Sequence, residues 1–276
     1  MKHYFLFVLI LIGLIFSSCK KDECSGIENK SGLISRISES GKITVEYAYQ
    51  CSGLLSEIRT IYNCTKHFYK SDGRLEKIEF YIDAKQYGYS GTGGYGGYGG
   101  YGYGYAQTEW TNPNDMVLYS TTFYEYNDNK QLIKYINKFG DVIIQSEFSY
   151  NNQGRISTQT AYYENEGSDK YVEYFYDEFG NLTKVSQYLI QPDRTTVLHS
   201  IREYEFDTKQ NPFFAFKKLL IPGRNTNPNN ITKEMYTFYG EISGGVDSLT
   251  TTNHVYEYNG LGYPIKMDNN ITFEYN

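Results

Sequence analysis

The chain has 276 residues, a formal net charge of −6 and 31 tyrosines. Its basic residues are scattered, whereas nucleic-acid binding needs a clustered basic face, so we expect no nucleic-acid partner. After an apolar run at the start, no stretch approaches the ~20 apolar residues that a membrane-spanning helix needs.

The first residues, MKHYFLFVLILIGLIFSSC, combine a basic start, an apolar run from Tyr4 to Phe16 and two serines before Cys19. The run is too short to span a bilayer comfortably, which indicates a secretory signal over residues 1–18. Small residues directly before a cysteine resemble the lipobox of bacterial lipoproteins. This resemblance implies that Cys19 is acylated and anchors the protein to a membrane. The alternative is ordinary cleavage near Ser18, which leaves a free thiol at Cys19.

The residues that follow the anchor are two lysines and two acids, Lys20, Lys21, Asp22 and Glu23. This run resembles the export tag that sends many Bacteroidetes lipoproteins to the outer face of the outer membrane. The alternative is a solvated tether with the protein facing the periplasm. We therefore expect a lipid-anchored outer-membrane protein, with a tether over residues 19–30 and one β domain over residues 31–276.

Three further cysteines remain for an oxidising compartment. If residues 33–38, 43–50 and 54–62 form consecutive antiparallel strands, Cys51 lies in a turn at the end nearest Cys24. Cys64 then lies at the opposite end, roughly 25 Å away along a strand that rises about 3.3 Å per residue. The preferred disulfide is Cys24 with Cys51, and the alternative is that all three thiols stay unpaired.

Several segments share one pattern: an alternating aromatic run, a tyrosine, an Asn or Asp, a turn with Gly, and an aliphatic residue. They are VEYAYQCSGLL (45–55), HFYKSDGRLEKI (67–78), FYEYNDNKQLIKY (123–135), EFSYNNQGRIS (147–157), VEYFYDEFGNLTKV (172–185) and VYEYNGLGYPIKM (255–267). A diverged copy, REYEFDTKQNPFF (202–214), has Asn211 and Pro212 where Gly and the aliphatic residue are expected. The period suits one β-hairpin per repeat.

Alternation within each repeat favours half-buried strands, and Asn or Asp followed by Gly favours tight turns. Aromatic residues occupy both faces of the strand in VEYFY. One face takes Tyr171, Glu173 and Phe175, and the other takes Val172, Tyr174 and Tyr176. Only residues 230–239 offer room for a turn or two of helix.

The pattern resembles the YD (RHS-type) repeat, most closely in Tyr176-Asp177-Glu178-Phe179-Gly180-Asn181-Leu182. It is also similar to short, repeat-bearing Bacteroidetes lipoproteins of unknown function with a porin-like β fold. The resemblance implies an all-β, antiparallel meander of hairpins that forms a curved open sheet or a partly closed barrel. Most copies lack the aspartate, which argues against the regular winding of long RHS shells.

The run YGGYGGYGYGY interrupts the repeats within an insertion over residues 87–105. Its tyrosines change spacing from every third to every second residue, so no single strand geometry holds the rings on one face. We expect a flexible connection. Its tyrosines are candidate ligand contacts, or a tolerated low-complexity expansion: Tyr95, Tyr98, Tyr101, Tyr103 and Tyr105.

Glycines at 91–96 match a dinucleotide-binding spacing, but the strand, helix and acidic residue that the motif requires are missing. His67, His199 and His254 lack the spacing of a zinc site, so we expect no metal. Acidic turns lack the ligand count of a calcium loop, and turn propensity explains them. We expect no cofactor.

Strand carboxylates recur beside the motif tyrosines, at Glu125, Glu147, Glu173, Glu203, Glu205 and Glu257. Paired carboxylates can hydrolyse glycosides, which makes a glycoside hydrolase one alternative. Their recurrence in the repeats instead favours a structural ladder with cross-strand Lys or Arg, so we expect no catalytic residue.

Tyrosine offers a flat apolar face and a hydrogen-bonding tip, which suits recognition of sugars or proteins. Within the repeats its strand propensity is the simpler explanation. Asp247-Ser248-Leu249 resembles a Bacteroidetes O-glycosylation sequon in a loop-like polar run, with Ser248 as acceptor. The leading hypothesis is a non-enzymatic envelope protein with a binding or structural role, whose partner is a polysaccharide or an envelope protein. The alternative is glycan capture through exposed tyrosines.

Overall fold

The computed structural model describes residues 32–84, 110–163, 169–240 and 245–276. Within these ranges the chain forms one 17-stranded sheet and three 3₁₀ helices. The strands are β1 (Ile34–Glu39), β2 (Lys42–Tyr49), β3 (Leu55–Thr60), β4 (Asn63–Tyr69), β5 (Leu75–Asp83), β6 (Met116–Tyr126), β7 (Leu132–Phe139), β8 (Val142–Tyr150), β9 (Ile156–Tyr163), β10 (Lys170–Tyr176), β11 (Leu182–Ile190), β12 (Thr196–Gln210), β13 (Asn229–Tyr239), β14 (Val246–Asn253), β15 (Tyr256–Tyr258), β16 (Pro264–Met267) and β17 (Ile271–Tyr275). The helices are η1 (Pro113–Asp115), η2 (Pro212–Leu219) and η3 (Arg224–Thr226).

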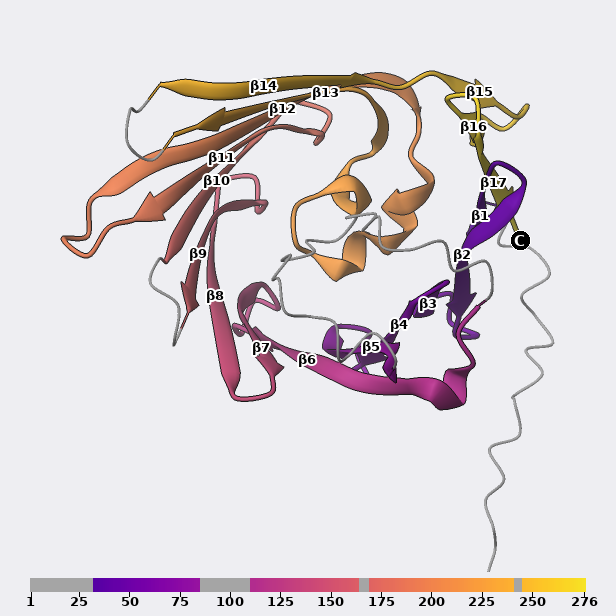
Figure 1. Cartoon of the computed structure of the whole chain (residues 1–276), viewed down its shortest axis with the longest axis horizontal. Coiled ribbons are helices and arrows are strands. Elements are labelled where there is room, and N and C mark those ends of the chain that lie inside the picture. Colours follow the sequence, from indigo (N-terminus) through magenta and orange to yellow (C-terminus); the bar gives the residue numbers. More distant parts are fainter. Residues whose placement is uncertain (1–31, 85–109, 164–168, 241–244) are drawn as a thin grey trace, which may run out of the picture.

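The sheet is an antiparallel meander in which strands that follow each other in the chain pair with each other. It curls until the last strand, β17, pairs with β1 (Figure 1). Within the described residues β14 pairs with β13 and β15 pairs with β16, and the sheet is not closed into a barrel. The predicted all-β antiparallel meander is therefore confirmed, in its curved and open form.

The repeat turns share one hydrogen-bond pattern. In the turn between β10 and β11, the Asp177 N–H donates to the Asn181 carbonyl (3.0 Å) and the Gly180 N–H donates to the Asp177 carbonyl (3.2 Å). Gly180 has a φ of +97°, in the left-handed region that favours glycine. The Asp177 carboxylate closes the turn by accepting from the Asn181 N–H at 2.8 Å. The Asn or Asp and the Gly of the motif are thus turn residues, as the sequence predicted.

All of these turns lie at one rim of the curled sheet, because antiparallel strands alternate in direction. We call this rim, which joins β2 to β3, β4 to β5 and so on to β15 and β16, the motif rim. The aliphatic residues that follow the turns are buried behind it: Ile34, Leu55, Leu75, Leu132, Ile156 and Leu182. The other connections, including the one that contains the Gly/Tyr-rich run, leave from the opposite rim.

Residues 211–228, between β12 and β13, turn inward and lie inside the curled sheet (Figure 1). We call this segment the plug. Within it, η2 begins at Pro212, and the Asn211 side chain caps it by accepting from the Phe213 N–H at 3.0 Å. Phe216 and Leu219 point one way at helical spacing and are buried.

The expected turn of helix at 230–239 is wrong, because those residues form strand β13. Its burial pattern shows no helical stripe, and the strand pairs with β12 on one side and β14 on the other. The described helical turns lie elsewhere, two of them in the plug just upstream.

The predicted alternation in β10 is confirmed. Tyr174 is 8% exposed on the inner face, whereas Phe175 is 44% exposed on the outer face. No helix in the described ranges is long and apolar enough to cross a membrane.

Candidate functional site: the tyrosine clamps, the plug and the inner wall

The tyrosines that end β2, β4, β6, β8, β10 and β17 each donate their hydroxyl to a backbone carbonyl of the neighbouring strand, and Tyr256, which opens β15, makes an equivalent bond. The acceptor is the aliphatic residue that opens the strand immediately before it in the chain, and the last strand uses Pro264 of β16 in the same way. Tyr256 differs, because its acceptor is Ile231 of β13, two strands earlier. The bonds run from Tyr49 to Ile34 (2.6 Å), Tyr69 to Leu55 (2.8 Å), Tyr126 to Leu75 (2.8 Å), Tyr150 to Leu132 (2.8 Å), Tyr176 to Ile156 (2.7 Å), Tyr256 to Ile231 (2.9 Å) and Tyr275 to Pro264 (2.6 Å). We call these bonds the tyrosine clamps.

The clamps need a protonated hydroxyl, and burial supplies it. Burial raises the pKa of Tyr256 to about 12 and drives the pKa of Tyr49 higher still. The Tyr256 and Tyr49 hydroxyls therefore stay protonated, and able to donate, beyond the pH at which a free tyrosine ionises. Their repetition follows from the architecture of the sheet and needs no ligand to explain it.

The diverged repeat breaks this pattern where the plug begins. Phe206 stands at the clamp position and has no hydroxyl to donate. Asp207 still does the work of a turn residue, because its carboxylate accepts from the Asn230 N–H at 3.1 Å, across the whole inserted segment. The plug is therefore an enlarged repeat turn between Asp207 and Asn230.

Asparagine side chains tie the plug to the sheet. Asn227, only 1% exposed, accepts from the Leu182 N–H at 2.8 Å. Asn211 donates from its side-chain amide to the carbonyls of Arg224 (2.6 Å) and Asn227 (2.8 Å). Tyr258 donates to the Asp207 carboxylate. Each buried polar group thus meets a partner, which fixes the plug in one position.

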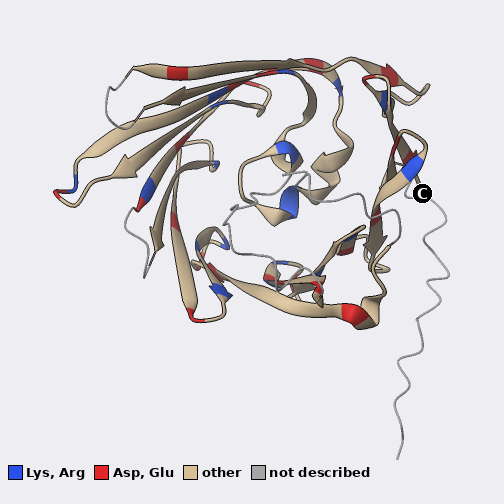
Figure 2. Ribbon diagram, in the orientation of Figure 1, with Lys and Arg blue, Asp and Glu red and all other residues tan. Residues whose placement is uncertain are grey.

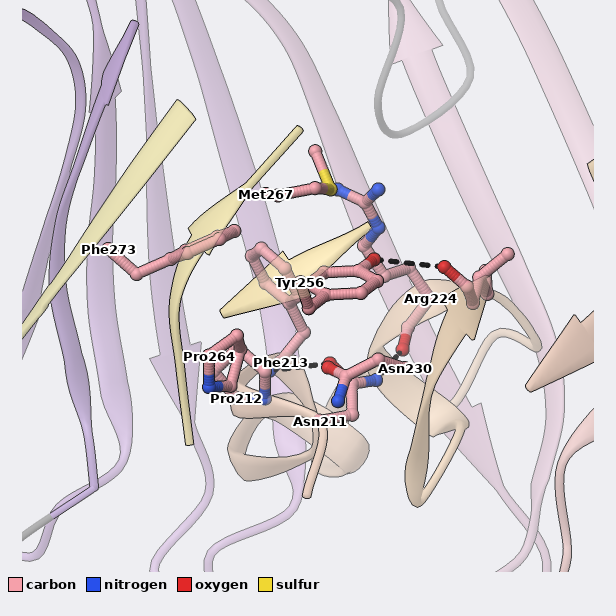
Figure 3. Close-up of a pocket in the computed structure, with 10 residues that line it drawn as sticks. Asn211, Pro212, Phe213, Arg224, Asn230, Tyr256, Pro264, Met267 and Phe273 are labelled. Carbon is pink, nitrogen blue, oxygen red and sulfur yellow. Dashed lines mark hydrogen bonds between the residues drawn. The ribbon is translucent and has the colours of Figure 1, made fainter. Parts of the chain in front are cut away.

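The base of the plug encloses a cavity of about 10 Å³ (Figure 3). It is lined by Asn211, Pro212, Phe213, Arg224, Asn230, Ile231, Tyr256, Pro264, Met267 and Phe273. That volume holds about one water molecule. This cavity is therefore a small packing gap between the plug and the last strands, and it is too small to bind a metabolite.

The inner wall beyond the core is polar as well as aromatic. The Tyr174 hydroxyl donates to the Gln159 side chain at 2.6 Å, and Gln159 donates in turn to the Ser146 hydroxyl at 3.0 Å. Ser146 is fully buried and Tyr135 lies 3.4 Å from the same amide. This network is satisfied within the wall and its members are buried or half-buried, so it specifies packing.

A charged patch lies on the same inner face, further toward β14. Across four neighbouring strands, Tyr174 stands opposite Val185, Val185 opposite Arg202 and Arg202 opposite Tyr236, which places the four on one face of the sheet. Arg202 bonds to the Glu234 carboxylate at 3.0 Å, and its guanidinium lies 4.8 Å from the centre of the Tyr236 ring. The Arg202 side chain is 51% exposed and the Glu234 side chain is 31% exposed, so this inner-wall patch is accessible to a ligand.

The strand carboxylates form the predicted ladder at all positions but one, Glu173, which stands opposite Ser186 and Thr158 and accepts from the Tyr188 hydroxyl instead. Glu205 pairs with Lys233 at 2.8 Å and Glu257 pairs with Lys266 at 3.1 Å, each across two neighbouring strands. Lys134 stands opposite Glu125 on one side and Glu147 on the other, and Lys184 stands opposite Glu203. Figure 2 shows positive and negative residues interspersed along the strands.

The three histidines of the domain lie apart. His67 is 3% exposed on the inner face, His199 packs edge-on against Phe238 at 4.9 Å, and His254 lies 3.0 Å from Asp268. No group of three or more His, Cys, Asp or Glu in the described part of the chain is placed to hold a metal ion.

Most of the predicted site residues fall outside the described residues. These are Cys19, Lys20, Lys21, Asp22, Glu23, Cys24, Tyr95, Tyr98, Tyr101, Tyr103 and Tyr105. Cys51 is disulfide-bonded, whereas Cys64 is free and buried. Pairing of Cys51 with Cys24 stays a prediction.

Ser248 is exposed as expected, but its placement in a loop is wrong. Residues 246–253 form strand β14, in which Ser248 stands opposite Phe238. The β-branched residues around it favour a strand over a loop.

The two ends of the connection between β5 and β6 are fastened together. Thr111 is 4% exposed and donates its hydroxyl to the Asp83 carboxylate at 2.7 Å. Its N–H donates to the Ile61 carbonyl at 3.1 Å. The connection therefore leaves and rejoins the sheet at one point, as an insertion does.

The plug, its asparagine anchors and the inner-wall patch were missed by sequence reasoning. The break in the repeat at Asn211 and Pro212, followed by PGRNTNPNN at 222–230, is the signal that could have marked the plug.

The chain thus belongs to a structural class of curled antiparallel meanders with an internal plug. It is similar to a porin-like protein from Bacteroides vulgatus, with a TM-score of 0.50 and 10% sequence identity, over 88% of this chain and 99% of that one. A porin-like protein from Bacteroides uniformis matches 89% of this chain and 98% of its own, at 11% identity and a TM-score of 0.40. At these identities the likeness concerns the fold. No family model and no curated protein sequence matches the chain.

Proposed function

We propose that this chain is a lipid-anchored protein of the cell envelope, anchored through Cys19, whose curled sheet serves binding or structure and not catalysis. One observation carries the non-enzymatic part. The residues that recur in the repeats are occupied by the fold, with the tyrosines in clamps and the carboxylates opposite lysines. The porin-like fold supports an envelope role by analogy.

The anchor is tested by feeding cells a labelled fatty acid and comparing the full chain with its Cys19→Ser variant. We expect label on the natural chain and none on the variant. Equal labelling, or none on either, would contradict the anchor.

Surface display is tested by adding protease to intact cells while a periplasmic protein serves as the integrity control. Loss of the domain would support display on the outer surface and a role for Lys20 to Glu23 as the export tag. Protection until the cells are permeabilised would place the domain in the periplasm.

A second candidate function is glycan capture, which the inner-wall patch favours. Arg202 supplies several donors, Glu234 supplies acceptors, and Tyr236 supplies an aromatic face beside them. Sugar hydroxyls need such donors and acceptors in a fixed arrangement. We expect polysaccharide binding to fall at least tenfold in an Arg202→Ala variant and to be unchanged in Lys233→Ala, which alters the outer face.

The Gly/Tyr-rich run gives a competing location for the same activity. Replacing Tyr95, Tyr98, Tyr101, Tyr103 and Tyr105 by serine would abolish glycan binding if the rings of that run hold the ligand. Unchanged binding would assign capture to the inner wall. A hydrolase is rejected if single Gln replacements of the strand carboxylates leave no position on which polysaccharide cleavage depends.

A further inference from the structure

Strand β14 leaves one edge of the sheet open. Every residue from Val246 to Asn253 is exposed, and in the described part of the chain β14 pairs with β13 alone. The strands that follow it are short, since β16 ends at Met267 and turns back to β17. Figure 1 shows β14 running far beyond β15, β16 and β17 along the upper side of the sheet.

The direction of the backbone groups on this edge follows from the residues next to it. The His254 N–H donates to the Thr232 carbonyl at 2.8 Å, so His254 points its backbone groups at β13. Because these groups alternate along a strand, the groups of Val255 point the other way. Asp268 satisfies them, since its N–H donates to the Val255 carbonyl (2.7 Å) and its carboxylate accepts from the Val255 N–H (3.0 Å).

The same row continues beyond Asp268 with no described strand beside it. It consists of the N–H and C=O groups of Leu249, Thr251 and Asn253, and the alternation ends at the β-bulge that contains Asp247. The edge also lacks the usual protection, because β14 contains no lysine and no proline. Its one charge is Asp247, and Leu249 is 66% exposed.

We propose that β14 pairs antiparallel with β14 of a second copy of this chain, about a twofold axis at Thr250. Residues on one face of a sheet must meet residues on the same face, so odd residues oppose odd and even oppose even. With the axis at Thr250, the regular part of the strand is used: Leu249 opposes Thr251, Ser248 opposes Thr252 and Thr250 opposes itself.

This register is self-complementary in its side chains, which favours a second copy over an unrelated strand. Thr–Thr and Ser–Thr pairs are favourable across strands, and like charges directly opposite are not. The two Asp247 residues stand at opposite ends of the interface, so like charges do not meet. The proposal concerns self-association and is independent of the lipid anchor and of glycan capture.

A single strand pair is smaller than a standard stable interface, so the dimer forms at high local concentration and dissociates on dilution. Covalent trapping in cells is therefore the suitable test. In the proposed register Thr250 forms a non-hydrogen-bonded pair with itself, with Cα atoms about 4.5 Å apart, which suits a disulfide. The two Ser248 residues lie about 13 Å apart, four residues at about 3.3 Å each, which a disulfide cannot span.

The experiment compares Thr250→Cys and Ser248→Cys in the full chain, oxidised in intact cells and separated without reductant. We expect a dimer of this chain from Thr250→Cys and at least tenfold less from Ser248→Cys. Adding Thr251→Pro to the Thr250→Cys chain should abolish the dimer, because it removes an edge N–H that β13 does not use.

No dimer from Thr250→Cys, or equal dimer from both cysteine variants, would overturn the proposal. A cross-link to a protein of another size would assign the edge to a different partner and would also overturn it. Circular dichroism of each variant confirms that it is folded, and a Thr251→Pro chain that keeps its fold and still dimerises counts against the register.

Discussion

At the scale of single residues, each clamp tyrosine joins two repeats by two means. Its ring packs against the core, and its hydroxyl satisfies a carbonyl that the turn leaves without a strand partner. A phenylalanine ring can pack against the core but cannot donate this hydrogen bond. Phe206 stands at this position in the repeat that opens into the plug. One oxygen atom thus distinguishes a regular repeat from the interrupted one.

Tyr150→Phe tests the clamp. The change leaves the ring in place and strands the carbonyl of Leu132, a residue that is fully buried. We expect the free energy of unfolding to fall by about 1–3 kcal/mol, the cost of an unsatisfied buried polar group. Urea titration of Tyr150→Phe beside Tyr162→Phe, whose side chain is more exposed, measures it. Equal stability of the two variants would count against the clamp.

Gly154→Ala tests the turn conformation. Gly154 has a φ of +74°, and a Cβ at either Gly154 or Gly260 would meet no atom within 4 Å. Of these two glycines only Gly154 has a positive φ, so the two substitutions differ in backbone strain and not in crowding. We expect Gly154→Ala to lose about 1 kcal/mol or more and Gly260→Ala to lose less, by thermal unfolding. A larger loss at Gly260 would contradict this.

His67 gives the protein a pH dependence. Burial lowers its pKa from 6.5 to about 4, so the unfolded chain binds this proton first as the pH falls. Titration of His67 therefore leaves the free energy of unfolding unchanged above pH 6.5 and lowers it by roughly 3 kcal/mol between pH 6.5 and 4. Urea titrations at both pH values should show a smaller loss for His67→Leu. The same pH loss in both chains would exclude His67 as the source.

At the scale of elements, the repeat turn is a module that tolerates enlargement. The bond from the turn Asp or Asn to the residue before the aliphatic is kept whether the turn is short, as at Asp177, or contains the plug, as at Asp207. The plug can fold inward because its asparagines satisfy backbone groups that water serves elsewhere. It then supplies core residues that a curved sheet of this width cannot provide alone.

Phe216→Ala tests the contribution of the plug. Phe216 is 5% exposed and stacks on Tyr47 with ring centres 5.2 Å apart. Truncating a buried phenylalanine leaves a cavity, and we expect a loss of about 3–5 kcal/mol in the free energy of unfolding. Lys217→Ala on the exposed side of η2 is the control. A loss at Phe216 as small as the loss at Lys217 would mean that the plug is not part of the core.

At the scale of the whole molecule, the chain ends hold the curled sheet together. β17 pairs with both β1 and β16, and the Asn276 N–H donates to the Leu33 carbonyl at 2.9 Å. These contacts join residues at the two extremes of the domain. Their formation requires the whole meander to curl, because hairpins alone pair only neighbours.

Deleting residues 271–276 tests this closure. The deletion removes Phe273 from the core and leaves β1 with one partner in place of two. We expect a lower midpoint and a broader transition in calorimetry, since the first and last repeats would no longer unfold together. Glu274→Ala, on the outer face, should leave the transition unchanged. A truncated chain with the natural midpoint would show that closure adds no stability.

Sequence reasoning found what depends on neighbours in the chain. Hairpin positions, the turn residues Asp177 and Gly180, and the faces of Tyr174 and Phe175 follow from period-2 alternation and turn chemistry. The carboxylate ladder followed from recurrence, because most repeats place their Glu opposite a Lys of a neighbouring strand, as Glu125 and Glu147 do with Lys134. These features require only a few residues and are written into each repeat.

Other features were decided by contacts between distant segments. The pairing of β17 with β1, the burial of Asn227 beneath Leu182 and the open row on β14 have no local signature. β14 resembles any polar strand until the short β16 leaves its edge uncovered. The sequence by itself determined an all-β meander of hairpins, because strand alternation and turn chemistry act within one repeat. Only the tertiary structure decided the curl, the inward plug and the free edge, because these depend on how many strands fit around one core.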